Sequence, residues 1–196
     1  MVGGEPSEGS RRYCGTVHQL YRAIRMWFRR NGPRLPLHGV SRVPFRTWPS
    51  DIDIFKHMNN GVYFSILDHG RSDILYRTGL AAKLRAAGLY PVVAGETMTF
   101  RKSLLPWQAF VVESRVVGFD ERSSYMEQRF VADGEIYARA FIRSRFLRKS
   151  GGTVSIAELG ELLGMDVSAR PDPWLIEWGQ RTALPPTRAE APSEWR

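Results

Sequence analysis

The chain has 196 residues, 43% of them hydrophobic, which is typical of one packed domain rather than two. Its formal net charge is +8, but nine arginines and only two acidic residues lie in residues 1–50, so the remainder is almost neutral. A basic arm on a near-neutral body argues against nucleic-acid binding, and we predict no nucleic-acid partner. The single cysteine, Cys14, excludes an intrachain disulfide and favours a reducing, cytoplasmic compartment.

The histidines lack the spacing of any metal-ligand motif, so we predict no metal and no cofactor. They are His18, His38, His57 and His69. Arginines interrupt the early apolar residues before a continuous apolar run develops. We therefore expect neither a secretory signal peptide nor a membrane span.

Residues 1–39 form a basic N-terminal arm, and residues 16–30 within it have the pattern of an amphipathic helix. Its apolar residues at helical spacing are Val17, Leu20, Tyr21, Ile24, Trp27 and Phe28. One interpretation is contact with an anionic membrane surface, which would make the protein peripheral there. The alternative is a helix that docks on the protein's own body or on another subunit, and a transit peptide is a third. Asn31-Gly32-Pro33 ends the helix.

The main domain is expected at residues 40–165. It begins with a β-like segment at 41–49, followed by an acidic loop and a long helix. Asn59 or Asn60 can cap this helix, which runs to about Arg77, and Gly79 fits its C-terminal stop. One side of the helix is predicted to be buried. It carries Tyr63, Ile66, Leu67, Gly70, Ile74 and Leu75.

Four segments rich in β-forming residues follow, at 90–103, 109–118, 123–132 and 135–147. Asp133-Gly134 predicts a tight hairpin turn, and residues 120–123 predict a second turn. One strand, one helix and four antiparallel strands indicate an α+β fold, with an antiparallel sheet wrapped around a long central helix.

The C-terminal extension is expected at 166–196. A short helix within 151–164 precedes it and ends near Gly164. Residues 171–178 can dock on the body through Trp174, Leu175, Ile176 and Trp178. Beyond about Arg181 the composition indicates disorder, so we expect the extension to be partly disordered.

Residues 40 to about 150 resemble the hot-dog acyl-CoA thioesterases, the group that includes 4-hydroxybenzoyl-CoA thioesterase. The resemblance rests on the block Asp51-x-Asp53-x-x-x-His57-Met58-Asn59-Asn60-x-x-Tyr63, then Asp68-x-x-Arg71 on the helix and Gly79-Leu80 after it. It implies a hot-dog fold, an acyl-CoA substrate, and a homodimer or higher homo-oligomer with active sites between subunits near the helix N-termini. It covers neither the basic helix nor the tail after about Gly164.

Thioester hydrolysis needs a carboxylate that attacks the carbonyl or activates water, and donors aimed at the oxygen that gains charge. The first amides of a helix are unpaired and can be such donors, and Asn60 and Gly61 stand at that position. By the resemblance, the catalytic carboxylate corresponds to Asp53 and the polarising amide to Asn60. Another hot-dog subgroup carries its catalytic acid on the helix, where this chain has Asp68.

Each candidate also has a structural interpretation. Asp51 and Asp53 can stabilise a turn, and Asp68 can pair with Arg71 one turn away. His57 is predicted to shape the substrate site rather than to act as a base, and Asn59 to cap the helix or fix the loop. We place Tyr63 and Phe64 in the acyl-binding pocket, with the hydrophobic core as the alternative.

A basic group near the last predicted strand has two interpretations. Its residues are Arg139, Arg143, Arg145, Arg148 and Lys149. They can contact CoA phosphates, or they can form a solvated strand face. Acyl-CoA hydrolysis is the favoured function, and the alternative is a non-catalytic acyl-CoA or lipid-binding protein at a membrane surface. A hydratase is disfavoured because no second His–acid pair is evident.

Overall fold

The computed structural model describes residues 22, 24, 29, 31–186 and 188–193. The strands that it places are β1 (Ser41–Arg46), β2 (Leu89–Phe100), β3 (Ala109–Phe119), β4 (Ser124–Ala132), β5 (Glu135–Arg148) and β6 (Thr153–Val154). The helical elements are the 3-10 turn η2 (Pro49–Asp51) and the helices α2 (Asn60–Arg77), α3 (Leu80–Ala86), α4 (Ile156–Leu163) and α5 (Pro173–Arg181). The strand and helix order predicted from the sequence is confirmed, and η2, α3, β6 and α5 are additional elements.

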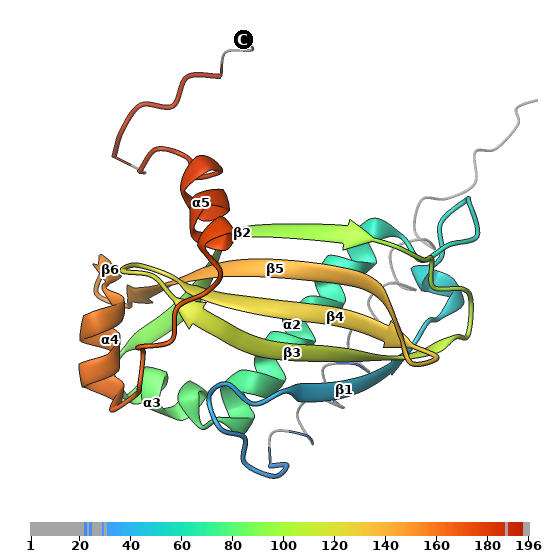
Figure 1. Ribbon diagram of the computed structural model, residues 1–196, viewed down its shortest axis with the longest axis horizontal. Coiled ribbons are helices and arrows are strands. Elements are labelled where there is room, and N and C mark those ends of the chain that lie inside the picture. The colour runs from blue at the N-terminus through green and yellow to red at the C-terminus, as the bar shows by residue number, and fades with distance from the viewer. Residues whose placement is uncertain (1–21, 23, 25–28, 30, 187, 194–196) are drawn as a thin grey trace, which may run out of the picture. The chain divides into compact units, whose positions relative to one another are not determined.

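The strands form an antiparallel sheet in the order β1-β3-β4-β5-β2, with β6 paired to β5 (Figure 1). The β1–β3 register runs from Ser41 opposite Ser114 to Arg46 opposite Ala109. Both strands at the ends of this order contain a proline, Pro44 in β1 and Pro91 in β2. Proline lacks the N–H that a central strand must donate, so its presence is compatible with an edge position.

By their internal contacts, the residues divide into two compact units. Unit 1 is Met1–Ala81, Phe100–Arg115 and Gln128–Arg139, and unit 2 is Ala82–Thr99, Val116–Glu127 and Ala140–Arg196. Unit 1 therefore holds β1, η2, α2, the first two residues of α3, the last residue of β2 and one portion each of β3, β4 and β5. Unit 2 holds the rest of α3 and of these strands, with β6, α4 and α5.

In unit 1, α2 begins and ends where the sequence predicts. The Asn59 side chain accepts a hydrogen bond from the Gly61 amide, and Gly79 follows the helix with φ of 77°. The predicted apolar face is buried except for Leu75, which is half-buried, and Asp73 joins that face. The burial of a carboxylate on this face was not predicted.

Gly70 allows α2 to lie unusually close to the strands. A Cβ at this position would lie 2.6 Å from both Gln128 Nε2 and Ser114 Oγ, which is too close for any side chain. Gln128 is fully buried and donates to Ser114 Oγ at 2.8 Å and to the Leu67 carbonyl at 3.1 Å. The helix backbone is thus hydrogen-bonded directly to a side chain of β4, which a larger residue at 70 would prevent.

Aromatic rings fill the core of unit 1. Tyr63 on α2 meets Phe100 and Phe130 edge-on, with ring centroids 5.1 Å and 4.8 Å away. Phe110 lies 5.6 Å from Phe130 and 5.7 Å from Phe45. Such pairs stabilise by about 0.5–1.5 kcal/mol beyond their buried area. The chain of contacts joins α2 to β1, β3 and β4.

In unit 2, two capped helices pack on the strand portions. Ser155 caps α4, which ends at Gly164 with φ of 58°, as predicted. Asp172 caps α5, and its Trp174 ring meets Phe141 of β5 edge-on at 4.9 Å. Leu175 of the same helix is buried. The expectation that this part of the C-terminal extension docks on the body is therefore confirmed.

The described residues of the N-terminal arm contact the body of unit 1 through arginines. Arg22 Nη2 donates to Asp51 Oδ2 at 2.6 Å, and both side chains are buried. Arg29 donates to Asp73 Oδ1 at 3.2 Å and to the Arg42 carbonyl at 2.9 Å. Ile24, assigned by its spacing to the apolar stripe, is 47% exposed.

These contacts support docking of the arm on the protein's own body through Arg22 and Arg29. The Trp27 and Phe28 positions lie outside the described residues. Among the described residues, no helix combines the length and apolar character needed to cross a bilayer.

Asp73 gathers the polar contacts that join the arm, β1 and α2. Its carboxylate is fully buried and accepts from Ser41 Oγ at 2.5 Å, Arg29 at 3.2 Å and Arg77 at 3.2 Å. We expect Asp73→Asn to lower the free energy of unfolding by about 3 kcal/mol, because removal of one charge of a buried pair leaves the other charge buried and unpaired. Denaturant unfolding measures this. The matched change Glu177→Gln, which removes an exposed pair with Arg181, should cost under about 0.5 kcal/mol; equal losses would refute the central role of Asp73.

Candidate active site

The segment before α2 folds back on itself as a short loop with three successive cross-links. The Asn59 amide donates to the Asp51 carbonyl at 2.8 Å, Ile52 and Met58 form an antiparallel bridge, and the Asp53 amide donates to the His57 carbonyl at 2.9 Å. Residues 54–56 form its exposed tip, where Lys56 adopts φ of 63°. The loop therefore brings Asp53 back toward the start of α2.

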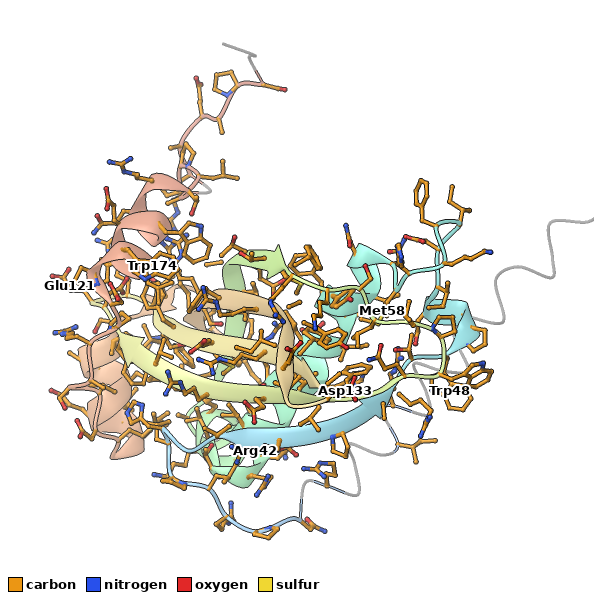
Figure 2. All side chains as sticks on the ribbon, turned by 45° about the vertical axis from the view of Figure 1, so that its right-hand side comes forward. Arg42, Trp48, Met58, Glu121, Asp133 and Trp174 are labelled. Carbon is orange, nitrogen blue, oxygen red and sulfur yellow. The ribbon has the colours of Figure 1, made fainter. Side chains whose placement is uncertain are left out.

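Contacts to the body hold the base of this loop. Met58 is buried and its amide donates to the Leu104 carbonyl at 3.1 Å. Asp51 is buried as well, and besides Arg22 its carboxylate accepts from the Trp48 amide at 2.8 Å. Figure 2 labels Trp48, which precedes the loop, and Met58, which lies near the end of it. Asp51 thus has the structural role that was its alternative interpretation.

Asp53 uses one carboxylate oxygen to stabilise the loop. Asp53 Oδ1 accepts from the Phe55 amide at 2.8 Å and from the His57 amide at 3.4 Å. The other oxygen makes no hydrogen bond to any described residue. The His57 side chain is exposed. This arrangement is compatible with both interpretations of Asp53, because Oδ1 can stabilise the turn while the second oxygen takes part in a reaction.

The two predicted oxyanion donors differ in their availability. The Gly61 amide donates to Asn59 Oδ1 at 2.8 Å, so in this structure the cap occupies it. The Asn60 amide has no hydrogen-bond partner among the described residues. The Asn59 cap thus engages the Gly61 amide and leaves the Asn60 amide unpaired, and the roles of both amides as oxyanion donors stay predictions.

Asp68 lies on the exposed side of α2 and pairs with Arg71 one turn later, as its structural interpretation predicted. Its side chain is 70% exposed. Arg71 also donates to Gln128 Oε1 at 3.2 Å. Asp68 is thereby connected to the buried hydrogen bonds around Gly70, which hold its helix against the strands.

Tyr63 is a core residue. Its ring is buried, and its hydroxyl oxygen accepts from the Leu104 amide at 3.2 Å. Burial raises the pKa of the Tyr63 hydroxyl, and the hydrogen bond from Leu104 partly offsets this. Tyr63 is therefore part of the core and Phe64 is half-buried, and contact of either ring with an acyl chain stays a prediction.

His69 was not singled out from the sequence. Its ring lies 6.1 Å from that of Phe45, and burial lowers the pKa of the imidazole, as does the charge of Arg22, while Asp68 raises it. A lowered pKa keeps this imidazole neutral near pH 7. The sequence around His69 did not predict this burial. The burial depends on tertiary neighbours, Phe45 of β1 and Arg22 of the arm.

Within the described ranges, no group of three or more histidine, cysteine or acidic side chains is arranged to hold a metal ion. The groups that the loop presents are a carboxylate, a helix N-terminus and an exposed imidazole. A carboxylate beside unpaired helix amides can activate a nucleophile while the amides stabilise negative charge on an acyl oxygen.

Comparison with known proteins places this geometry in a family. The profile of the thioesterase-like superfamily matches residues 47–190. Protein THEM6 of Xenopus laevis is 36% identical over 97 residues, covering 50% of this chain and 47% of its own length. Protein THEM6 of Danio rerio is 38% identical over 102 residues, covering 51% and 50%. The chain thus matches about half the length of these relatives.

Solved structures show the fold. The probable thioesterase YbaW of Escherichia coli superposes with a TM-score of 0.59 at 20% identity, over 65% of this chain and 98% of that one. A gentisyl-coenzyme A thioesterase superposes with a TM-score of 0.54 at 16% identity, over 59% and 95%. The antiparallel sheet and long helix are those of the hot-dog class. Because the family profile matches more than half of its length, the chain belongs to the thioesterase-like superfamily.

Proposed function

We propose that this protein hydrolyses acyl-CoA thioesters, with Asp53 as the reacting carboxylate. The observation that carries the proposal is the arrangement of the loop. One Asp53 oxygen is fixed by backbone amides while the other makes no hydrogen bond within the described chain, and the loop returns directly to the unpaired Asn60 amide. A fixed carboxylate and a free helix amide are the two groups that acyl transfer requires.

In the proposed reaction, Asp53 accepts a proton from water as the water oxygen bonds to the thioester carbon. The carbonyl oxygen gains negative charge and accepts a hydrogen bond from the Asn60 amide at the positive end of α2. Collapse of this intermediate breaks the C–S bond, and the leaving thiolate takes the proton. Direct attack by Asp53 would instead form an anhydride that water then hydrolyses. His57 shapes the site from the same loop.

The membership of the superfamily and the similar fold of a gentisyl-coenzyme A thioesterase support CoA as the thiol. A second candidate is an acyl-CoA or lipid binder without turnover. It is favoured by the occupied Gly61 amide, because one donor stabilises an oxyanion less than two. Release of free thiol from a panel of acyl-CoAs separates the two candidates, since a binder releases none.

Turnover is expected to depend on the charge of Asp53. Asp53→Asn keeps the size of the side chain and its hydrogen bond to the Phe55 amide but removes the charge. We expect kcat for acyl-CoA hydrolysis to fall by about 10²–10⁴, the usual contribution of a positioned base. Asp68→Asn, on the exposed side of α2, is the matched control and should lower kcat far less.

Thermal melting of both variants excludes unfolding as the cause. Near-normal turnover of folded Asp53→Asn with collapse of Asp68→Asn would assign the chemistry to Asp68. Full activity in both variants would end the carboxylate mechanism.

We further propose that the protein is a homodimer or a higher homo-oligomer. The strand β2 ends the sheet order and is twelve residues long, and its Tyr90 and Val93 side chains are exposed. A long apolar edge strand favours pairing with another strand.

Light scattering should therefore give at least twice the monomer mass. Val93→Lys should shift the protein toward monomer, because a charge on the edge opposes strand pairing. Leu162→Lys, which changes an exposed leucine on α4, is the control and should leave the mass unchanged. A monomeric wild-type chain at micromolar concentration would contradict the proposal.

Finally, we propose a cytoplasmic protein that is peripheral at an anionic membrane surface through residues 16–30. Arg22 and Arg29 are engaged in ion pairs with the body, so Arg25 and Arg30 are the cations to test. The double change Arg25→Gln with Arg30→Gln should weaken binding to phosphatidylserine-containing vesicles roughly tenfold or more, since each basic residue near such a surface contributes about 1 kcal/mol. Vesicle flotation measures this, with pure phosphatidylcholine vesicles as the control. A wild-type protein that ignores both vesicles would leave docking on the body as the whole role of the arm.

A further inference from the structure

Unit 2 contains a cavity of about 550 Å³ where α5 covers the β3–β4 turn and β5. We call it the α5 cavity. It is lined by Asp120, Glu121, Arg122, Ser123, Arg143, Arg145, Arg170, Ile176, Gln180 and Ala183. Figure 2 labels Glu121 at the turn and Trp174 on α5. The volume falls in the range of small-molecule sites, and four of the lining residues are arginines.

Arg143 is the most deeply buried of these cations. It is only 5% exposed, and its Nε has no hydrogen-bond partner. Its Nη2 makes one long hydrogen bond, 3.4 Å, to the Ala94 carbonyl. Arg143 makes no ion pair with any described residue. A buried guanidinium without a counter-charge is costly, so the position calls for an anion.

One acidic residue of the cavity, Asp120, already has hydrogen-bond partners on both carboxylate oxygens. Asp120 Oδ1 accepts from the Arg122 and Ser123 amides at 2.7 Å and 2.6 Å, and Oδ2 accepts from the Tyr125 hydroxyl at 2.7 Å. Burial, then the hydrogen bond to Asp120, raises the pKa of Tyr125, so the hydroxyl remains a donor to that carboxylate. Asp120 therefore stabilises the turn rather than neutralising Arg143.

The other arginines of the cavity also retain donors. Arg145 lies two residues along the same face of β5, and its Nε is buried without a partner. Arg170 Nη1 donates a hydrogen bond to the Phe119 carbonyl at 3.0 Å. The sequence left open whether Arg143 belongs to a solvated strand face. That interpretation is wrong for Arg143, because α5 covers its side chain. A Cβ added at Gly179 of α5 would lie only 3.1 Å from Arg143 Nη1.

We propose that the α5 cavity binds a phosphate-bearing small molecule, with Arg143 and Arg145 donating to its phosphate oxygens and Ile176 and Ala183 contacting its organic part. Guanidinium groups match phosphate oxygens geometrically and remain charged at all physiological pH values. The cavity exceeds what a single inorganic ion fills, which favours a ligand with further atoms. This inference does not depend on thioester hydrolysis at Asp53.

The phosphate has two sources, the CoA part of a thioester substrate or a separate phosphorylated molecule. Isothermal titration with pyrophosphate as the probe detects the site in either case. Competition by CoA, together with a raised KM for acyl-CoA in a cavity variant, identifies the substrate as the source. An unchanged KM in a cavity variant, although the wild-type protein binds pyrophosphate and the variant does not, identifies a separate ligand. Both outcomes support the cavity, and the binding measurement stands even if the protein hydrolyses nothing.

Two variants test the cavity without relying on the buried Arg143. Arg145→Gln removes a donor from a half-buried position, and Ala183→Trp fills the space near the end of α5. Each should raise the dissociation constant for pyrophosphate on the order of tenfold or more, the usual weight of a charge-assisted hydrogen bond or of lost access. Arg181→Gln is the matched control, since it removes the same charge from α5 outside the cavity.

Wild-type binding that weakens with added salt, persists in Arg181→Gln and fails in both cavity variants is the expected result. Circular dichroism confirms that the variants are folded. The proposal is overturned if wild-type protein shows no heat of binding with millimolar pyrophosphate, or if both cavity variants bind it as tightly as the control.

Discussion

The close approach of α2 to β3 and β4 at Gly70 is the constraint on which the site in unit 1 depends. Without a side chain at that position, Gln128 can hydrogen-bond at once to Ser114 and to the Leu67 carbonyl of the helix. A buried side-chain amide with satisfied partners specifies one position of the helix far more strictly than apolar packing does. The N-terminus of α2, and with it the Asn60 amide, is therefore set from the middle of the helix.

Buried charge is used in two opposite ways in this molecule. In unit 1, Asp51 and Asp73 are buried and each is paired with an arginine of the arm, so their desolvation is offset and the arm is tied to the body. In unit 2, Arg143 is buried to the same degree with no ion pair among the described residues. The contrast indicates that Asp51 and Asp73 are structural and that Arg143 is placed to bind a ligand.

In the proposed reaction, Asp53 both stabilises its loop and acts as the reacting carboxylate. Its Oδ1 closes the turn, and this fixes the direction of the other oxygen. A reacting carboxylate must be rigid as well as accessible, because catalysis depends on preorganised geometry. The helix cap limits the number of free donors at the site, since Asn59 accepts from the Gly61 amide and leaves the Asn60 amide as the free donor.

Local patterns in the sequence determined the α+β order, the limits of α2, the Asp133-Gly134 turn and the loop motif around Asp53, because caps, turns and periodicity act within a few residues. The burial of Asp73, the Arg22–Asp51 pair and the α5 cavity were decided by the tertiary structure alone. Each depends on residues about 30 or more positions apart, such as Arg143 under Gly179, and no local pattern encodes which charge such a contact will bury. Asp73 could have been suspected, since it stands three residues after Gly70 on the predicted apolar face, but its partners could not.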